Sequence, residues 1–129
     1  MGNESKAVGY PLTVINVPKT IDNDLVQTDH CPDYGSATRL VAPATMGAGR
    51  DAESMGFASP ITIIEVMGRD AGWLAALAKG EERDAPHIIG VPEALVDEDR
   101  FLARIEDAYS RYGFAVAVIA EKKRGPGVV

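Results

Sequence analysis

Four short apolar segments alternate with three segments of helical character, and this alternation constrains the fold more than any other feature of the sequence. The apolar segments are Leu12–Val17, Ile61–Met67, His87–Val91 and Phe114–Ala120. Their apolar residues follow one another almost without interruption, as expected for strands whose two faces are both covered. Strands that are separated by helices form parallel sheets. The sequence therefore predicts an α/β fold in which a parallel sheet has helices on both faces.

Three helices are predicted between these segments, at Ser36–Met55, Asp70–Ala78 and Asp97–Tyr112. The last has the clearest pattern, because its apolar residues recur every three or four positions. The first contains Pro43, whose ring and missing N–H disturb a helix interior. We therefore expect a bend or break near this proline.

Composition and charge limit the class of protein. With 129 residues, 46% of them hydrophobic and 25% charged, the chain has the composition of a soluble globular domain. No apolar run approaches the roughly 20 residues that a membrane-spanning helix needs. The formal net charge of -6 argues against a general nucleic-acid binder. Cys31 is the only cysteine, so no intramolecular disulfide can form, and a cytoplasmic location is expected.

Polar groups follow every predicted strand, at the edge where parallel sheets bind their ligands. They are Lys19, Thr20, Asp22 and Asp24 after the first strand, Gly68 and Arg69 after the second, Glu93 after the third and Glu121 after the fourth. The carboxyl ends of parallel strands meet at one edge, so we expect these groups to converge. Such a combination of carboxylates and cations suits an anionic substrate.

The first of these loops is the most informative. Asp22 and Asp24 are separated by one residue, so their side chains would project the same way from an extended loop. Two such carboxylates can hold a divalent metal and accept a proton, while Lys19 and Thr20 could hold a phosphoryl group. The alternative is a solvated turn, because Asp-Asn-Asp is equally typical of turns. The spacing alone does not decide between them.

Gly68 and Arg69 form a second candidate site. Glycine lets a ligand approach the backbone closely, and arginine offers a planar fork for phosphate. A surface arginine without a partner is the alternative interpretation.

Two of these loops resemble motifs of the phosphofructokinase family. Residues 18–24, Pro-Lys-Thr-Ile-Asp-Asn-Asp, resemble its catalytic loop, and residues 65–69, Glu-Val-Met-Gly-Arg, resemble its sugar-phosphate loop. Residues 119–121, Ile-Ala-Glu, also match in order and spacing. The resemblance runs from about residue 12 to residue 121 and implies part of a Rossmann-like phosphofructokinase fold. Residues 1–24 would end the donor-binding domain, and residues 25–129 would belong to the fructose 6-phosphate domain.

The resemblance also implies a role for each matching residue. Asp22 would be the general base for the C1 hydroxyl of fructose 6-phosphate, and Asp24 would help to hold Mg²⁺, although the main ligand of that ion is expected upstream of the chain. Thr20 and Ile21 would line the substrate, Met67, Gly68 and Arg69 would contact the sugar phosphate, and Glu121 would bind sugar hydroxyls. Lys19 and Arg69 would neutralise charge during transfer, which is the main catalytic demand of phosphoryl transfer.

Lys19 also bears on the phosphoryl donor. A lysine before Thr-Ile-Asp is typical of pyrophosphate-dependent members, although some ATP-dependent members carry it too. Because the family's donor-phosphate loops precede the first strand found here, the resemblance implies an internal piece of a glycolytic 6-phosphofructokinase. This piece would be inactive alone, and its parent would be a homodimer or homotetramer. An ATP-dependent enzyme and a non-catalytic sugar-phosphate-binding module are the alternatives.

Overall fold

The computed structural model of the chain describes residues 2–79, 86–94 and 97–121, and these contain one three-stranded sheet. The strands are β1 (Ile61–Val66), β2 (Ile88–Gly90) and β3 (Ala115–Ala120). Their order across the sheet is β1-β3-β2, and both neighbouring pairs are parallel. Three of the four predicted strands are therefore present, each with bounds within one residue of those predicted. They form the predicted parallel sheet.

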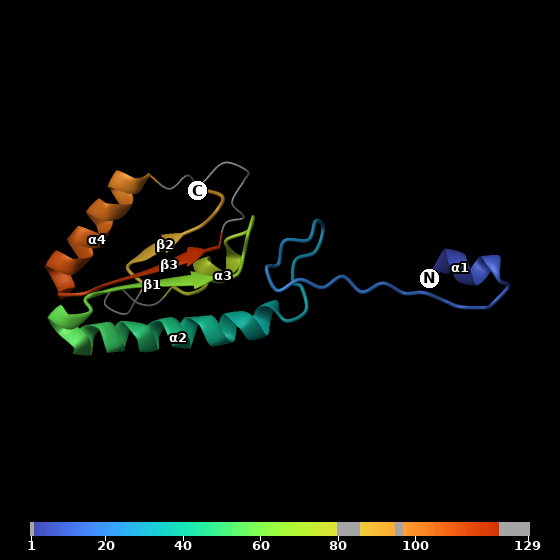
Figure 1. Ribbon diagram of the computed structural model, residues 1–129, viewed down its shortest axis with the longest axis horizontal. Coiled ribbons are helices and arrows are strands. Elements are labelled where there is room, and N and C mark those ends of the chain that lie inside the picture. Colours follow the sequence, from blue (N-terminus) through green and yellow to red (C-terminus); the bar gives the residue numbers. More distant parts are fainter. Residues whose placement is uncertain (1, 80–85, 95–96, 122–129) are drawn as a thin grey trace.

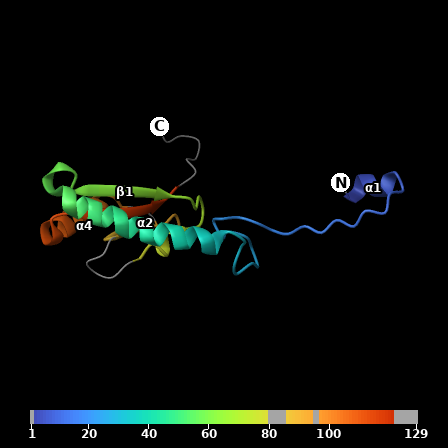
Figure 2. The ribbon, with the colours of Figure 1, turned by 90° about the horizontal axis from the view of Figure 1, so that it is seen from below.

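Helices cover both faces of this sheet, as the sequence predicts (Figure 1). The helical elements are α1 (Gly2–Ala7), α2 (Tyr34–Met55), the short 3-10 helix η1 (Gly56–Ala58), α3 (Trp73–Ala76) and α4 (Glu98–Tyr112). α2 and α3 pack on one face, and α4 packs on the other (Figure 1). Figure 2 shows α2 running alongside β1. No helix in the described ranges is long and apolar enough to cross a membrane.

The central strand β3 carries the core on both of its faces. Successive side chains of a strand point to opposite faces, and here small and larger side chains alternate. Ala115 and Ala117 pack with Ile105 of α4, whereas Val116 and Val118 pack against the α2 and α3 side. All four are completely buried, which explains why this segment reads as a continuous apolar run.

The predicted first strand is wrong, because residues 12–17 form no strand in the structure. This segment runs away from the sheet toward α1 (Figures 1 and 2). Its apolar side chains are exposed, with Val14 at 55%, Ile15 at 82% and Val17 at 70%. Strand formation requires a neighbour that accepts and donates the ladder hydrogen bonds, and no described segment lies beside this one. The apolar pattern indicates a preference of this segment for an extended strand, but it does not show whether a partner strand is present.

The helices differ from prediction at two points. α2 continues through Pro43, so the helix has no break there. Pro43 is exposed, and the carbonyl group that its missing N–H leaves unpaired can be hydrated. α3 is confined to Trp73–Ala76, because the residues before it form a tight turn instead of a helical one. α4 is confirmed: Asp97 caps it by accepting a hydrogen bond from the Arg100 N–H at 3.2 Å, and Gly113 ends it in a left-handed conformation with φ 80°.

His87, directly before β2, lies in an apolar environment at the N-terminal end of this strand. Its ring stacks on Tyr112 at 5.0 Å and meets Phe114 edge-on at 5.1 Å between centroids. Nδ1 accepts a hydrogen bond from the Val116 N–H at 3.0 Å. Nε2 is buried without a partner in the described part of the chain. Burial lowers the pKa of His87 below its ordinary value of 6.5.

We expect the chain to lose stability as the pH falls below 6.5, the ordinary pKa of His87. The folded state has the lower pKa, so folding carries no protonation penalty above that value and an increasing one as the pH drops through it. Urea unfolding followed by circular dichroism between about pH 7.5 and about pH 5.5 measures this loss. His87→Asn should remove it, whereas His30→Gln should retain it. An unchanged pH dependence in His87→Asn would mean that another group is responsible.

Candidate active site

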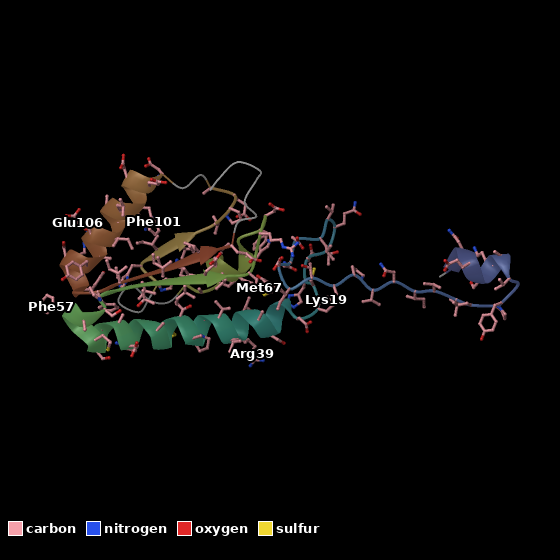
Figure 3. The ribbon with its side chains drawn as sticks, viewed as in Figure 1. Lys19, Arg39, Phe57, Met67, Phe101 and Glu106 are labelled. Atoms are coloured by element: carbon pink, nitrogen blue, oxygen red, sulfur yellow. The ribbon has the colours of Figure 1, made fainter. Side chains whose placement is uncertain are left out.

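The loops that follow β1 and β3 meet the segment of residues 19–24 at one end of the sheet. Charges on these loops act on one another: the Asp22 carboxyl senses Arg69, which follows β1, and Glu121, which follows β3. Figure 3 shows Lys19 and Met67 at this end, whereas Phe57 lies at the opposite end. The predicted convergence therefore occurs for Lys19, Asp22, Asp24, Arg69 and Glu121, although residues 12–17 are not a strand of this sheet.

Asp22 is the most buried acid of the site, with 9% of its surface exposed. Burial raises the pKa of Asp22 above its ordinary value, and the negative charges of Asp24 and Glu121 raise it further. Arg69 and Lys19 act in the opposite direction. The Oδ1 atom of Asp22 is buried and has no hydrogen-bond partner among the described residues. A carboxylate in these surroundings has an oxygen that can accept a proton from a bound hydroxyl.

The backbone between the two acids is not extended. Asn23 adopts a left-handed conformation with φ 58°, so the expectation that Asp22 and Asp24 project the same way is wrong. Asp22 is buried and Asp24 is exposed. Asparagine is one of the few residues that adopt this conformation readily. The loop therefore gives its two carboxylates different solvent environments, and a fully solvated turn does not describe it.

Asn23 also fixes the loop through its side chain, a role that the sequence analysis did not assign. Its Oδ1 accepts a hydrogen bond from the Cys31 N–H at 2.8 Å, and its Nδ2 donates to the Asp29 carbonyl at 3.2 Å. Both partners belong to the next loop, and Cys31 is completely buried. The only sequence signal was an asparagine between two acids, which is a common turn residue.

The three residues before Asp22 are less enclosed. The Lys19 ammonium lies 3.4 Å from the Asp33 carboxylate, and both side chains are more than half exposed. An exposed ion pair of this kind contributes little, about 0–1 kcal/mol, so Lys19 can exchange Asp33 for another anion at small cost. The Thr20 hydroxyl accepts a hydrogen bond from the Asp22 N–H at 3.2 Å. Ile21 is partly buried beside it.

The loop after β1 presents Met67 and Arg69 on a tight turn. The Ala71 N–H donates to the Gly68 carbonyl at 2.6 Å. A Cβ at Gly68 would lie 2.4 Å from the Ala71 oxygen, so only glycine fits there. Arg69 is left-handed, with φ 41°, and is exposed. The Glu121 N–H donates to the Val66 carbonyl at 2.7 Å, which fixes the end of β3 beside this loop.

An open pocket of about 660 Å³ lies next to these loops. Its polar lining includes Asp24, Thr28, Asp29 and Asp70, and Trp73 forms part of the wall. Trp73 is 52% exposed and is therefore not a core residue in the described part of the chain. Asp22 does not line this pocket. Among the described residues, no group of three or more His, Cys, Asp or Glu side chains could hold a metal ion.

Comparison with known proteins gives a consistent result. The family model described as Phosphofructokinase matches residues 2–127. The chain is 43% identical over 124 residues to the pyrophosphate–fructose 6-phosphate 1-phosphotransferase of Halomonas elongata, covering 93% of the chain and 30% of the relative. It is 47% identical over 121 residues to the protein of the same name from Xanthomonas campestris, covering 91% and 29%.

A solved structure agrees with these sequence matches. The chain superposes on the pyrophosphate-dependent phosphofructokinase from Marinobacter aquaeolei with a TM-score of 0.81 and 41% identity. The match covers 95% of this chain and 32% of that one. The chain thus spans about 30% of the length of the curated relatives it matches.

We expect Asn23→Ala to loosen the loop that contains Asp22 and Asp24. The change removes both side-chain hydrogen bonds and puts alanine into a left-handed conformation, at a combined cost of about 2–4 kcal/mol. Asn23→Gly removes the same bonds but tolerates the backbone, so it should cost about 1–2 kcal/mol less. Hydrogen exchange at the Cys31 amide measures the opening. A Cys31 amide that is equally protected in all three proteins would contradict the role of Asn23.

Proposed function

The chain belongs to the phosphofructokinase family, and on this premise we propose that it forms part of a 6-phosphofructokinase. The enzyme transfers a phosphoryl group from pyrophosphate to the C1 hydroxyl of fructose 6-phosphate. The observation that carries the proposal is the Asp22 carboxylate, which is buried, has a raised pKa and has an unpartnered Oδ1 among the described residues. It lies within the electrostatic reach of two cations that suit phosphate groups.

Asp22 acts as the general base in this proposal. Its Oδ1 accepts the proton of the C1 hydroxyl while the hydroxyl oxygen attacks phosphorus, and the bond from phosphorus to the leaving phosphate breaks. Arg69 and Lys19 offset the negative charge that accumulates on the transferring group. Positioning and charge neutralisation supply most of the catalysis in such reactions. The Asp22 environment fits this task, because a raised pKa strengthens the carboxylate as a proton acceptor.

The remaining residues of the site bind the sugar phosphate. Arg69 offers its guanidinium to the 6-phosphate, with Met67 and Gly68 forming the adjacent surface. Glu121 accepts hydrogen bonds from sugar hydroxyls, and Thr20 and Ile21 line the reacting end. The support for this assignment is the placement of these residues at one end of the sheet. Met67, Gly68, Arg69 and Glu121 lie on the loops that follow β1 and β3, and Thr20 and Ile21 directly precede Asp22, whose carboxyl interacts with Arg69 and Glu121.

Mg²⁺ is the cation that this proposal includes. The ion usually keeps several waters and binds one or two carboxylates together with substrate phosphates, so the exposed Asp24 fits as one ligand without a three-residue cluster. When bound, Mg²⁺ neutralises charge on the phosphoryl oxygens. Other ligands would come from the donor and from outside the chain.

Pyrophosphate is preferred as donor because the two curated relatives described above and the matching solved structure carry pyrophosphate in their names. Lys19 is consistent with it, since its exposed pairing with Asp33 leaves the ammonium accessible. We further propose that residues 1–24 belong to the donor-binding domain and residues 25–129 to the sugar-phosphate domain. The exposed apolar segment before residue 18 supports this division. The family also suggests a glycolytic, cytoplasmic homodimer or homotetramer.

A hybrid enzyme tests this function. In the hybrid, residues 2–127, which the family model matches, replace the corresponding part of the Halomonas elongata relative. We expect phosphorylation of fructose 6-phosphate with pyrophosphate and Mg²⁺, and a loss in kcat of about 10²–10⁴-fold in Asp22→Asn. Asp51→Asn, on the exposed side of α2, is the matched control. Activity with ATP alone would change the donor, and a folded hybrid without activity on either donor would leave a sugar-phosphate-binding module.

Arg69→Gln in the hybrid enzyme should weaken the binding of fructose 6-phosphate more than the binding of pyrophosphate. A charged hydrogen bond contributes about 1.5–3 kcal/mol, so the KM for the sugar phosphate should rise about 10- to 100-fold. Arg39→Gln, an exposed arginine of α2 (Figure 3), should leave both KM values unchanged. Steady-state kinetics with each substrate varied in turn makes the measurement. An equal rise in both KM values would contradict the assignment of Arg69 to the sugar phosphate.

A further inference from the structure

A carboxylate from the end of β2 holds the loop that carries Arg69. The Glu93 Oε1 atom accepts a hydrogen bond from the Gly72 N–H at 2.8 Å. Gly72 is the residue before α3, and α3 packs on β2 and β3. β1 and β2 are not neighbours in the sheet, because β3 lies between them. Glu93 therefore links the loop after one edge strand to the loop after the other.

The contact is close on all sides of Gly72. A Cβ at this position would lie 2.5 Å from the Val91 Cβ and 2.8 Å from the Glu93 Oε2. One carboxylate oxygen thus accepts the Gly72 N–H, and the other lies where a side chain at position 72 would begin. Any other residue at 72 would displace Glu93 or Val91. The close packing therefore requires glycine at position 72, and it holds the Glu93 carboxylate beside the Gly72 N–H.

Between Gly68 and Gly72, the chain passes through an unfavourable conformation. Arg69 has φ 41°, which places its Cβ close to the following carbonyl. Residues persist in such conformations when the surrounding structure determines them. Here the 2.6 Å hydrogen bond from the Ala71 N–H to Gly68 closes the turn, and the Glu93 bond anchors the residue that follows it. Removing the second contact would let the turn relax and Arg69 move.

We propose that Glu93 is a positioning residue for Arg69: its carboxylate fixes residues 68–72 from the end of β2, so that the guanidinium is already placed for the sugar phosphate. The inference rests on the proposed function, because it concerns the same substrate. Glu93 does not itself touch the substrate. It is exposed, so its replacement leaves no cavity in the core and need not unfold the protein.

Three substitutions in the hybrid enzyme test this role. Glu93→Ala removes the acceptor and should raise the KM for fructose 6-phosphate between about fivefold and about 100-fold, with the KM for pyrophosphate and the thermal midpoint nearly unchanged. Glu93→Gln keeps a side-chain oxygen at the same position and should restore most of the affinity. Glu106→Ala, an exposed residue of α4 (Figure 3), should have no effect.

A double variant separates positioning from a general structural role. If Glu93 acts through Arg69, then Glu93→Ala should add almost nothing to the KM of Arg69→Gln, because the group it positions is already missing. Effects that multiply, an unchanged KM in Glu93→Ala, or no rescue by Glu93→Gln would each overturn the proposal.

Hydrogen exchange provides a readout that does not depend on the proposed reaction. The Gly72 amide should exchange more slowly in the unaltered chain than in Glu93→Ala. Equal exchange in both proteins would show that the hydrogen bond from Gly72 to Glu93 does not form, and would overturn the inference by itself. An inactive hybrid with a protected Gly72 amide would instead contradict the proposed function and leave Glu93 as the anchor of this loop.

Discussion

β3 is buried on both of its faces, and this burial organises the sheet and the loops that follow its strands. Alanines face α4 and valines face α2 and α3, and both sets are completely buried. Because β1 and β2 each pair with this strand in a parallel register, the position of β3 determines where the three following loops begin. Arg69, Glu93 and Glu121 reach the same end of the sheet for this reason.

The balance of burial and charge around Asp22 follows from that arrangement. Burial and the neighbouring carboxylates raise the pKa of Asp22, while the cations Arg69 and Lys19 offset part of the effect. Each of these charged groups comes from a different loop or lies beside Asp22 in the sequence. A change in the sheet register would move Arg69 and Glu121 away from the carboxylate, so the chemistry of the site depends on strand packing as well as on the motif.

Two left-handed residues, Asn23 and Arg69, give the site loops their shape. Each occupies a conformation that costs energy for most residues, and each loop is held by side-chain hydrogen bonds to distant backbone groups. Asn23 bonds to the loop of residues 29–31, and Glu93 bonds to Gly72. The preorganisation of the two loops thus relies on residues outside the groups expected to contact a substrate.

The α/β class, three of the strands, the helix α4 and the polar residues at the sheet edge could all be predicted from the sequence. These follow from local patterns: continuous apolar runs, helical periodicity and polar residues directly after strands. The three-dimensional structure was needed to establish that residues 12–17 have no partner strand in the described ranges, that α2 continues through Pro43, and that Asp22 and Asp24 differ in burial. It also decided that Glu93 anchors the Arg69 loop. Strand pairing, burial and the anchoring of loops depend on which groups meet across long sequence separations, whereas a local pattern indicates only what each segment favours.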